Sequence, residues 1–89
     1  MDTTKQKYVR LKEYDSIIIF PEIIEHSEFS NWNVISAGFC YVNDHNSTVG
    51  CFGESVSLKL KSLPDDSEAA TKQIFGFDAM LNMIELNKE

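Results

Sequence analysis

The stretch from residue 33 to residue 61 constrains the fold more than any other part of this chain. It contains two long runs rich in β-branched and aromatic residues, joined by the turn-forming residues 43–47 (NDHNS). This pattern predicts a β-hairpin. With His45 and Asn46 at the centre of a tight turn, Cys40 faces Cys51. Because His is not usual at the first central position, a longer loop is the alternative.

Side chains alternate along a strand, so the hairpin register gives its two faces different characters. We expect the bulkier face to form the core beneath a helix: Ile35, Ala37, Phe39, Tyr41, Phe52, Val56, Leu58 and Leu60. The opposite face is small or weakly polar and becomes basic at its end: Ser36, Gly38, Cys40, Cys51, Gly53, Ser55, Ser57, Lys59 and Lys61. Glu54 falls on the core face, so either a bulge at Gly53 turns it outward or it lines a pocket.

Two shorter strands are expected before the hairpin. Residues 7–13 alternate and are rich in Lys and Arg, which is typical of an edge strand. Residues 16–20 (SIIIF) indicate a strand that is buried on both faces and ends at Pro21. A short helix or irregular turn follows over residues 22–27, and Trp32 is expected to cap one end of the core.

The C-terminal segment shows the clearest periodicity of the chain. Apolar residues spaced by four and three predict a helix over residues 65–86: Ala70, Ile74, Phe77, Leu81 and Ile84. Asp65 with Glu68, or Ser62 with Asp65, has the spacing of a capping box. Gly76 lies in the interior and is a candidate break, because Gly weakens a helix by about 1 kcal/mol relative to Ala.

The sequence therefore predicts an α+β fold: an antiparallel sheet of three to four strands with the C-terminal helix packed on one face. The expected strands are residues 7–13, 16–20, 33–43 and 48–61. Residues 1–89 form one domain, with residues 1–6 frayed.

A homodimer is expected from the length of this helix. About 20 helical residues span about 30 Å, which is longer than so small a sheet can cover. The protruding end would expose apolar side chains, a feature that usually marks a partner surface. The predicted dimer interface consists of Phe77, Met80, Leu81, Met83 and Ile84.

The charge pattern narrows the class of function. The net charge of −6 and pI of about 4.8 argue against direct binding to a nucleic-acid backbone. Basic residues cluster at the start of the chain, at Lys5, Lys7, Arg10 and Lys12, and are expected to pair with the acidic middle in the same chain or a neighbouring one. The acidic residues Glu22, Glu25, Glu28 and Asp44 form a solvated surface or imitate nucleic-acid phosphates.

Candidate reactive groups are few. Cys40 and Cys51 could form a disulfide, bind a soft metal with His45, or pack as reduced thiols; two Cys and one His do not complete a structural zinc site. His26 shares a helical face with Glu22 and is expected at the surface. The sequence Gly50–Ser55 is not a phosphate-binding loop, because its glycines lie within a strand. We therefore expect no catalytic residue, no metal site and no cofactor.

Three functional hypotheses follow. The first is a small acidic, non-enzymatic binding protein that acts as a homodimer on a partner protein. The alternative is a domain that binds a small polar, nucleotide-like ligand through Ser36, Gly38, Gly53, Glu54, Ser55 and Ser57. The third is an enzyme whose catalytic residues assemble across a dimer interface. The polar start of the chain, the lack of an apolar run of about 20 residues and the two cysteines indicate a cytoplasmic protein with no membrane segment.

Overall fold

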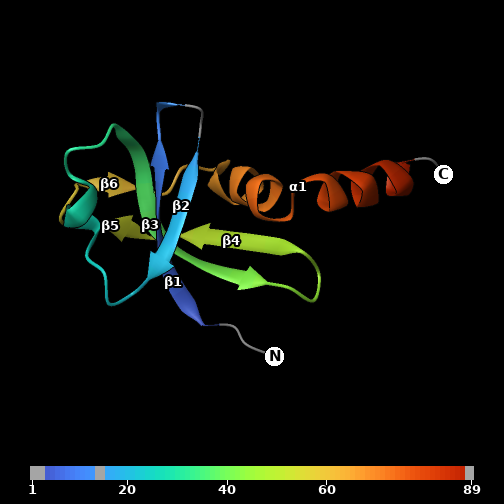
Figure 1. The fold of residues 1–89 in the computed structure, drawn as a ribbon, viewed down its shortest axis with the longest axis horizontal. Helices are drawn as coiled ribbons and strands as arrows, with labels where there is room; N and C mark the ends of the chain where they lie inside the picture. Colours follow the sequence, from blue (N-terminus) through green and yellow to red (C-terminus); the bar gives the residue numbers. More distant parts are fainter. Residues whose placement is uncertain (1–3, 14–15, 88–89) are drawn as a thin grey trace.

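The computed structural model describes residues 4–13 and 16–87, with side chains described up to Gly76. It is an α+β fold, as predicted: a four-stranded antiparallel sheet with one C-terminal helix packed against it (Figure 1). The elements are β1 (Lys5–Leu11), β2 (Ile17–Pro21), the 3₁₀ helix η2 (His26–Phe29), β3 (Val34–Asn43), β4 (Thr48–Phe52), β5 (Glu54–Ser55), β6 (Leu60–Lys61) and α1 (Asp66–Asn87).

The strand order of the main sheet is β2-β1-β3-β4, so the first strand is central. The prediction that residues 7–13 form an edge strand is therefore wrong. The basic residues of β1 that suggested an edge are paired instead. Lys5 lies 3.1 Å from Glu22 and Lys7 lies 3.7 Å from Glu25, which confirms the predicted pairing within one chain.

The β3–β4 hairpin has the predicted register. Cys40 pairs with Cys51, and Asn43 with Thr48 is the last pair before the turn. The turn therefore contains four residues, 44–47, with Ser47 at a φ of 54°, so the longer loop is the one adopted.

The prediction of one continuous strand over residues 48–61 is wrong, because the strand is interrupted twice. Gly53 adopts a φ of +78° and forms a bend that ends β4, so the next strand, β5, belongs to a second sheet. Residues 56–59 then form a turn in which the Lys59 N–H donates to Val56 O at 3.3 Å and Lys59 adopts a φ of 57°. The chain consequently folds back into a small second hairpin, β5–β6, that packs against β3.

The prediction of which sheet face the helix covers is also wrong. Helix α1 lies on the face of small side chains, where Tyr8, Ile17, Cys40 and Val49 form one buried cluster with Ala70. Ala69 and Phe75 of the helix also pack against this cluster. Ser36, Cys40 and Cys51 of this face thus lie beneath the helix.

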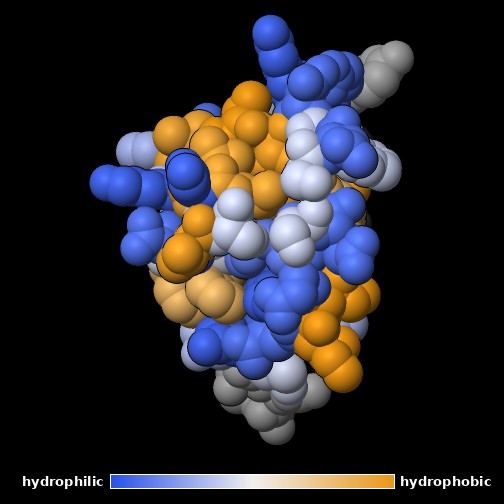
Figure 2. Space-filling model, turned by 90° about the vertical axis from the view of Figure 1, so that its left-hand side faces the viewer, coloured by the Kyte–Doolittle hydropathy of each residue, from blue (hydrophilic) through white to orange (hydrophobic). Residues whose placement is uncertain are grey.

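The opposite face is covered only in part. Val9, Leu11, Phe20 and Ala37 form a second buried cluster there, with Phe29, Val34, Leu58 and Leu60 packed against it. Its cover comes from η2 and the β5–β6 hairpin. Figure 2 views the molecule from the side on which η2, β5 and β6 lie, and it shows an apolar area broken by hydrophilic residues. Among the described large apolar side chains, the most exposed are Ile23 (88%), which precedes η2, and Val56 (82%), in the turn between β5 and β6.

Helix α1 begins with a cap that differs from both predicted ones. The Leu63 N–H donates to Asp66 Oδ2 at 2.9 Å, while the Asp66 N–H donates to Leu63 O at 3.0 Å. Pro64 follows Leu63, and Pro is favoured at the first helical position because it has no N–H that needs a partner there.

Gly76 interrupts α1, as the sequence indicated, with φ 54° and ψ −125°. The backbone after Gly76 extends away from the sheet (Figure 1). No helix within the described part of the chain combines the length and the apolar character that crossing a lipid bilayer requires.

Side chains of α1 bind the backbone of both edge strands. On β4, Ser67 Oγ accepts the Cys51 N–H at 2.8 Å and Thr71 Oγ1 accepts the Val49 N–H at 2.9 Å. On β2, Gln73 Oε1 accepts the Ile17 N–H at 2.6 Å, and its amide donates to Ile17 O. One helix therefore contacts both edges of the sheet.

Candidate functional site

Three of the six predicted ligand residues are buried. Ser36 lies beneath α1 and donates to Asp66 Oδ1 at 3.0 Å. Gly38 is approached so closely by Phe52 O and Ser62 that a side chain there would clash. Ser55 is buried in β5, and its Oγ accepts the Leu58 N–H at 3.2 Å.

The other three ligand residues are exposed. Glu54 is exposed, as in one of the two arrangements expected for it, but the cause is a break in the strand at Gly53 rather than a bulge. Glu54 is opposite Lys61 in the β5–β6 pair, and Ser57 lies in the turn between these strands. The structure therefore distributes the six residues over different layers.

The predicted dimer interface begins just beyond the described side chains. Phe77, Met80, Leu81, Met83 and Ile84 lie in the second half of α1, where only the backbone is described. Their role in a dimer stays a prediction.

A buried polar cluster joins α1 to the centre of the sheet. Asp66 is 0% exposed and accepts hydrogen bonds from Arg10 Nη1 at 2.8 Å and from the Tyr8 hydroxyl. Tyr8 also lies 2.7 Å from Ser62 Oγ. Burial and the hydrogen bond to Asp66 raise the pKa of Tyr8, which therefore stays a neutral donor.

Arg10 extends this cluster to the surface. Its guanidinium contacts both carboxylate oxygens of Asp65, at 2.9 and 3.3 Å. This bidentate pair holds the pKa of the Asp65 carboxyl below its usual range. Every buried side-chain nitrogen and oxygen among the described residues has a hydrogen-bond partner. The cluster is suited to fixing the start of α1 on the sheet rather than to holding a ligand.

The two thiols lie beside this cluster. Burial raises the pKa of Cys40 to about 11, and burial together with the neighbouring Cys40 and Asp66 raises the pKa of Cys51 to about 12. Both are free cysteines. His45 lies in the exposed turn, and no group of three or more His, Cys, Asp or Glu that could hold a metal occurs within residues 4–13 and 16–76.

His26 is buried, so the prediction of a surface histidine is wrong. Its Nε2 lies 2.9 Å from Gly38 O. Its ring contacts Phe20 and Phe39 edge-on, with centroids 5.6 and 5.8 Å apart. The ring serves as a packed link between η2 and the sheet. Trp32 was expected to cap the core; it contacts Phe29 at 5.8 Å but stays half exposed.

Aromatic side chains are exposed on the half of the sheet that η2 and the β5–β6 hairpin leave uncovered. Phe52 stacks on Tyr41 at 5.4 Å and on Phe39 at 6.1 Å. Lys5 Nζ lies 4.9 Å from the centre of the Phe39 ring. Tyr41 is 41% exposed and Phe52 is 40% exposed. Gly50 pairs with Tyr41, and the space that a side chain would fill there is empty. We call Lys5, Phe39, Tyr41, Gly50 and Phe52 the open face.

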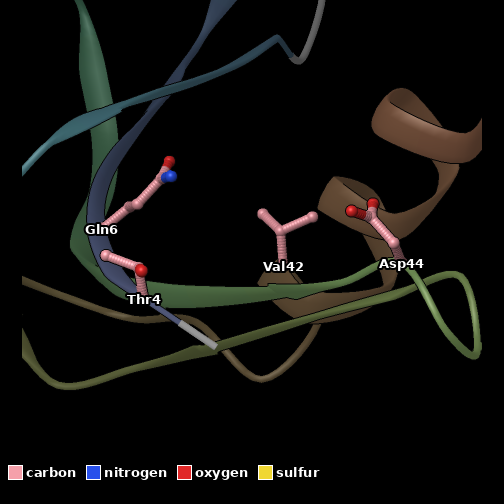
Figure 3. A pocket seen from close by; sticks show the side chains of 4 residues that line it. All are labelled: Thr4, Gln6, Val42 and Asp44. Atoms are coloured by element: carbon pink, nitrogen blue, oxygen red, sulfur yellow. The ribbon is translucent and has the colours of Figure 1, made fainter. Parts of the chain in front are cut away.

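The open face was missed in the sequence because its bulky residues were assigned to the core. Gly50 opposite Tyr41 was the available signal, since a glycine in a strand often marks a close approach of another chain. A separate hollow of about 220 Å³ is lined by Thr4, Gln6, Val42 and Asp44 (Figure 3). Its mixed lining carries no constellation of reactive groups.

No protein-family model, curated protein sequence or solved structure matches this chain.

Proposed function

We propose that this chain is a small, non-enzymatic binding protein that acts as a homodimer and recognises a partner protein through the open face. The observation that carries the proposal is the Tyr41–Phe52 stack, in which both side chains are about 40% exposed. Large aromatic side chains held rigidly at a surface are the residues that most often dominate protein interfaces.

The surroundings of the stack support this proposal. The aromatic rings are fixed by one another and by their strands, so little side-chain entropy is lost when a partner binds. Gly50, opposite Tyr41, leaves open space that a partner side chain can occupy. The free thiols are consistent with the reducing cytoplasm, where we place the protein.

The homodimer part of the proposal rests on the second half of α1. The backbone of this segment extends away from the sheet (Figure 1), and its sequence contains Met80, Leu81 and Ile84. Light scattering after size-exclusion chromatography is expected to give twice the mass of the chain. Leu81→Glu is expected to give a monomer, and a wild-type chain that is strictly monomeric would rule out the dimer.

Partner recognition can be tested with variants that keep the fold. Gly50→Val fills the open space opposite Tyr41, where an added Cβ meets nothing within 4 Å, and Tyr41→Ser removes half of the aromatic stack. Ile23→Ser is the control, because Ile23 is 88% exposed at the η2 end of the molecule. The immobilised variants are incubated with native-host lysate, and the retained proteins are quantified by mass spectrometry.

The proposal predicts that one set of proteins is retained about tenfold less by Gly50→Val and Tyr41→Ser, and equally well by Ile23→Ser. Equal retention by all variants would show that the open face is not the binding surface. If the retained proteins were lost with Ile23→Ser alone, the binding surface would lie at the apolar end seen in Figure 2, which would contradict the proposal.

A further inference from the structure

Cys40 and Cys51 face each other across β3 and β4. The Cys51 N–H donates to Ser67 of α1, so it points away from β3, and the two cysteines form a non-hydrogen-bonded pair of the ladder. The Cα atoms of such a pair are about 4.5 Å apart. This separation lies within the range of roughly 4.4–6.8 Å that disulfides span.

The two cysteines differ in their exposure to solvent. Cys40 is 0% exposed and lies in the cluster beneath α1. Cys51 belongs to the edge strand and is partly exposed beside Ser67. We therefore expect an oxidant to react first at Cys51, and Cys40 to react only through Cys51.

We propose that Cys40 and Cys51 form a dithiol modification site that a glutathione-class disulfide converts to an intramolecular disulfide. In the first step the Cys51 thiol loses its proton, and its sulfur attacks oxidised glutathione. A mixed disulfide forms, and one glutathione thiolate leaves and takes up a proton. In the second step the Cys40 sulfur loses its proton and attacks the Cys51 sulfur, which releases a second glutathione.

The overall reaction is balanced. The chain loses two electrons and two protons, and one oxidised glutathione gains them to give two reduced glutathione molecules. Because burial raises the pKa of both thiols, the reaction is slow at neutral pH and faster at alkaline pH. The product crosslinks edge strand β4 to β3 directly beneath α1.

The experiment treats the full chain, under native conditions at about pH 8.5, with oxidised glutathione. Wild type is expected to lose the mass of two hydrogen atoms, to become unreactive to maleimide, and to unfold at a higher urea concentration than the reduced chain. Cys40→Ala is expected to stop at the first step, with one glutathionyl group on Cys51. Cys51→Ala is expected to stay unmodified, because Cys40 is buried. Circular dichroism confirms that each variant is folded.

Three results would overturn the proposal. One is a wild-type chain that keeps a stable glutathionyl group, because Cys40 then does not reach Cys51. Another is a glutathionyl group on the folded Cys51→Ala variant. The third is a pair that stays reduced under native conditions and is oxidised only in urea.

Discussion

At the scale of single residues, two glycines in the β3–β4 hairpin have opposite environments. A Cβ at Gly38 would lie 2.6 Å from Ser62 Oγ and still closer to Phe52 O, whereas a Cβ at Gly50 would meet nothing within 4 Å. Gly38 is therefore required by the close approach of the chain around Phe52 and Ser62. Gly50 is not required by the fold.

Gly38→Ala is expected to lower the free energy of unfolding by about 1–3 kcal/mol, because the backbone around Phe52 must move to make room. Gly50→Ala is the matched control, and we expect unchanged or slightly higher stability, since Ala restricts the unfolded chain more than Gly does. Urea denaturation followed by circular dichroism measures both. Equal effects of the two substitutions would contradict this account of Gly38.

At the scale of elements, α1 covers the sheet and also protects the edge of β4. Residues four apart in a helix are separated by about 6 Å along its axis, and residues two apart in a strand by about 6.8 Å. Ser67 and Thr71 consequently match the outward N–H groups of Cys51 and Val49. An exposed strand edge invites pairing with other chains, and here the helix protects it.

Removing both hydroxyls, in Ser67→Ala with Thr71→Val, is expected to destabilise the chain by about 0.5–1.5 kcal/mol for each lost hydrogen bond. Amide hydrogen exchange of Val49 and Cys51 should then become faster. The Gly50 amide is an internal control, because alternation along the strand directs it toward β3. Unchanged exchange at Val49 and Cys51 would show that the hydroxyls do not protect this edge.

At the scale of the whole molecule, the sheet lies between two unequal layers. The helix side carries the polar cluster of Asp66, Arg10 and Tyr8 together with the two thiols. The other side is apolar beneath η2 and the β5–β6 hairpin, and aromatic and exposed at the open face. Titratable groups that folding keeps neutral are thus concentrated beneath α1, which makes stability sensitive to alkaline pH.

The pKa values of Cys40 and Cys51 are about 11 and 12 in the folded chain, against about 8.5 in an unfolded one. A raised pKa contributes stability that is fully present below about pH 8.5 and is lost as the pH rises through the folded values. We expect the urea midpoint of the reduced wild-type chain to fall steadily above about pH 8.5. The double variant Cys40→Ala/Cys51→Ala is the control, and its urea midpoint should fall less. An equal fall of the midpoint in both chains would contradict a role for the thiols.

Several features of the fold could be predicted from the sequence because they depend on neighbouring residues. Alternation and turn chemistry determined the register that pairs Cys40 with Cys51. Gly53 and Gly76 marked the end of β4 and the helix break, because only glycine adopts their positive φ angles readily. The periodicity of residues 65–86 determined a helix that begins within one residue of its observed start.

Tertiary structure decided what depends on contacts between distant segments. The helix covers the small face of the hairpin because Ser67, Thr71 and Gln73 find backbone partners at both sheet edges, and no local pattern encodes that match. Contacts between distant segments likewise place β1 at the centre of the sheet and His26 in the interior. The sequence by itself determined which side chains share a face of the hairpin. Only packing decided which face would be buried under α1 and which would expose Tyr41 and Phe52, because burial is settled by the elements that come to lie on each face.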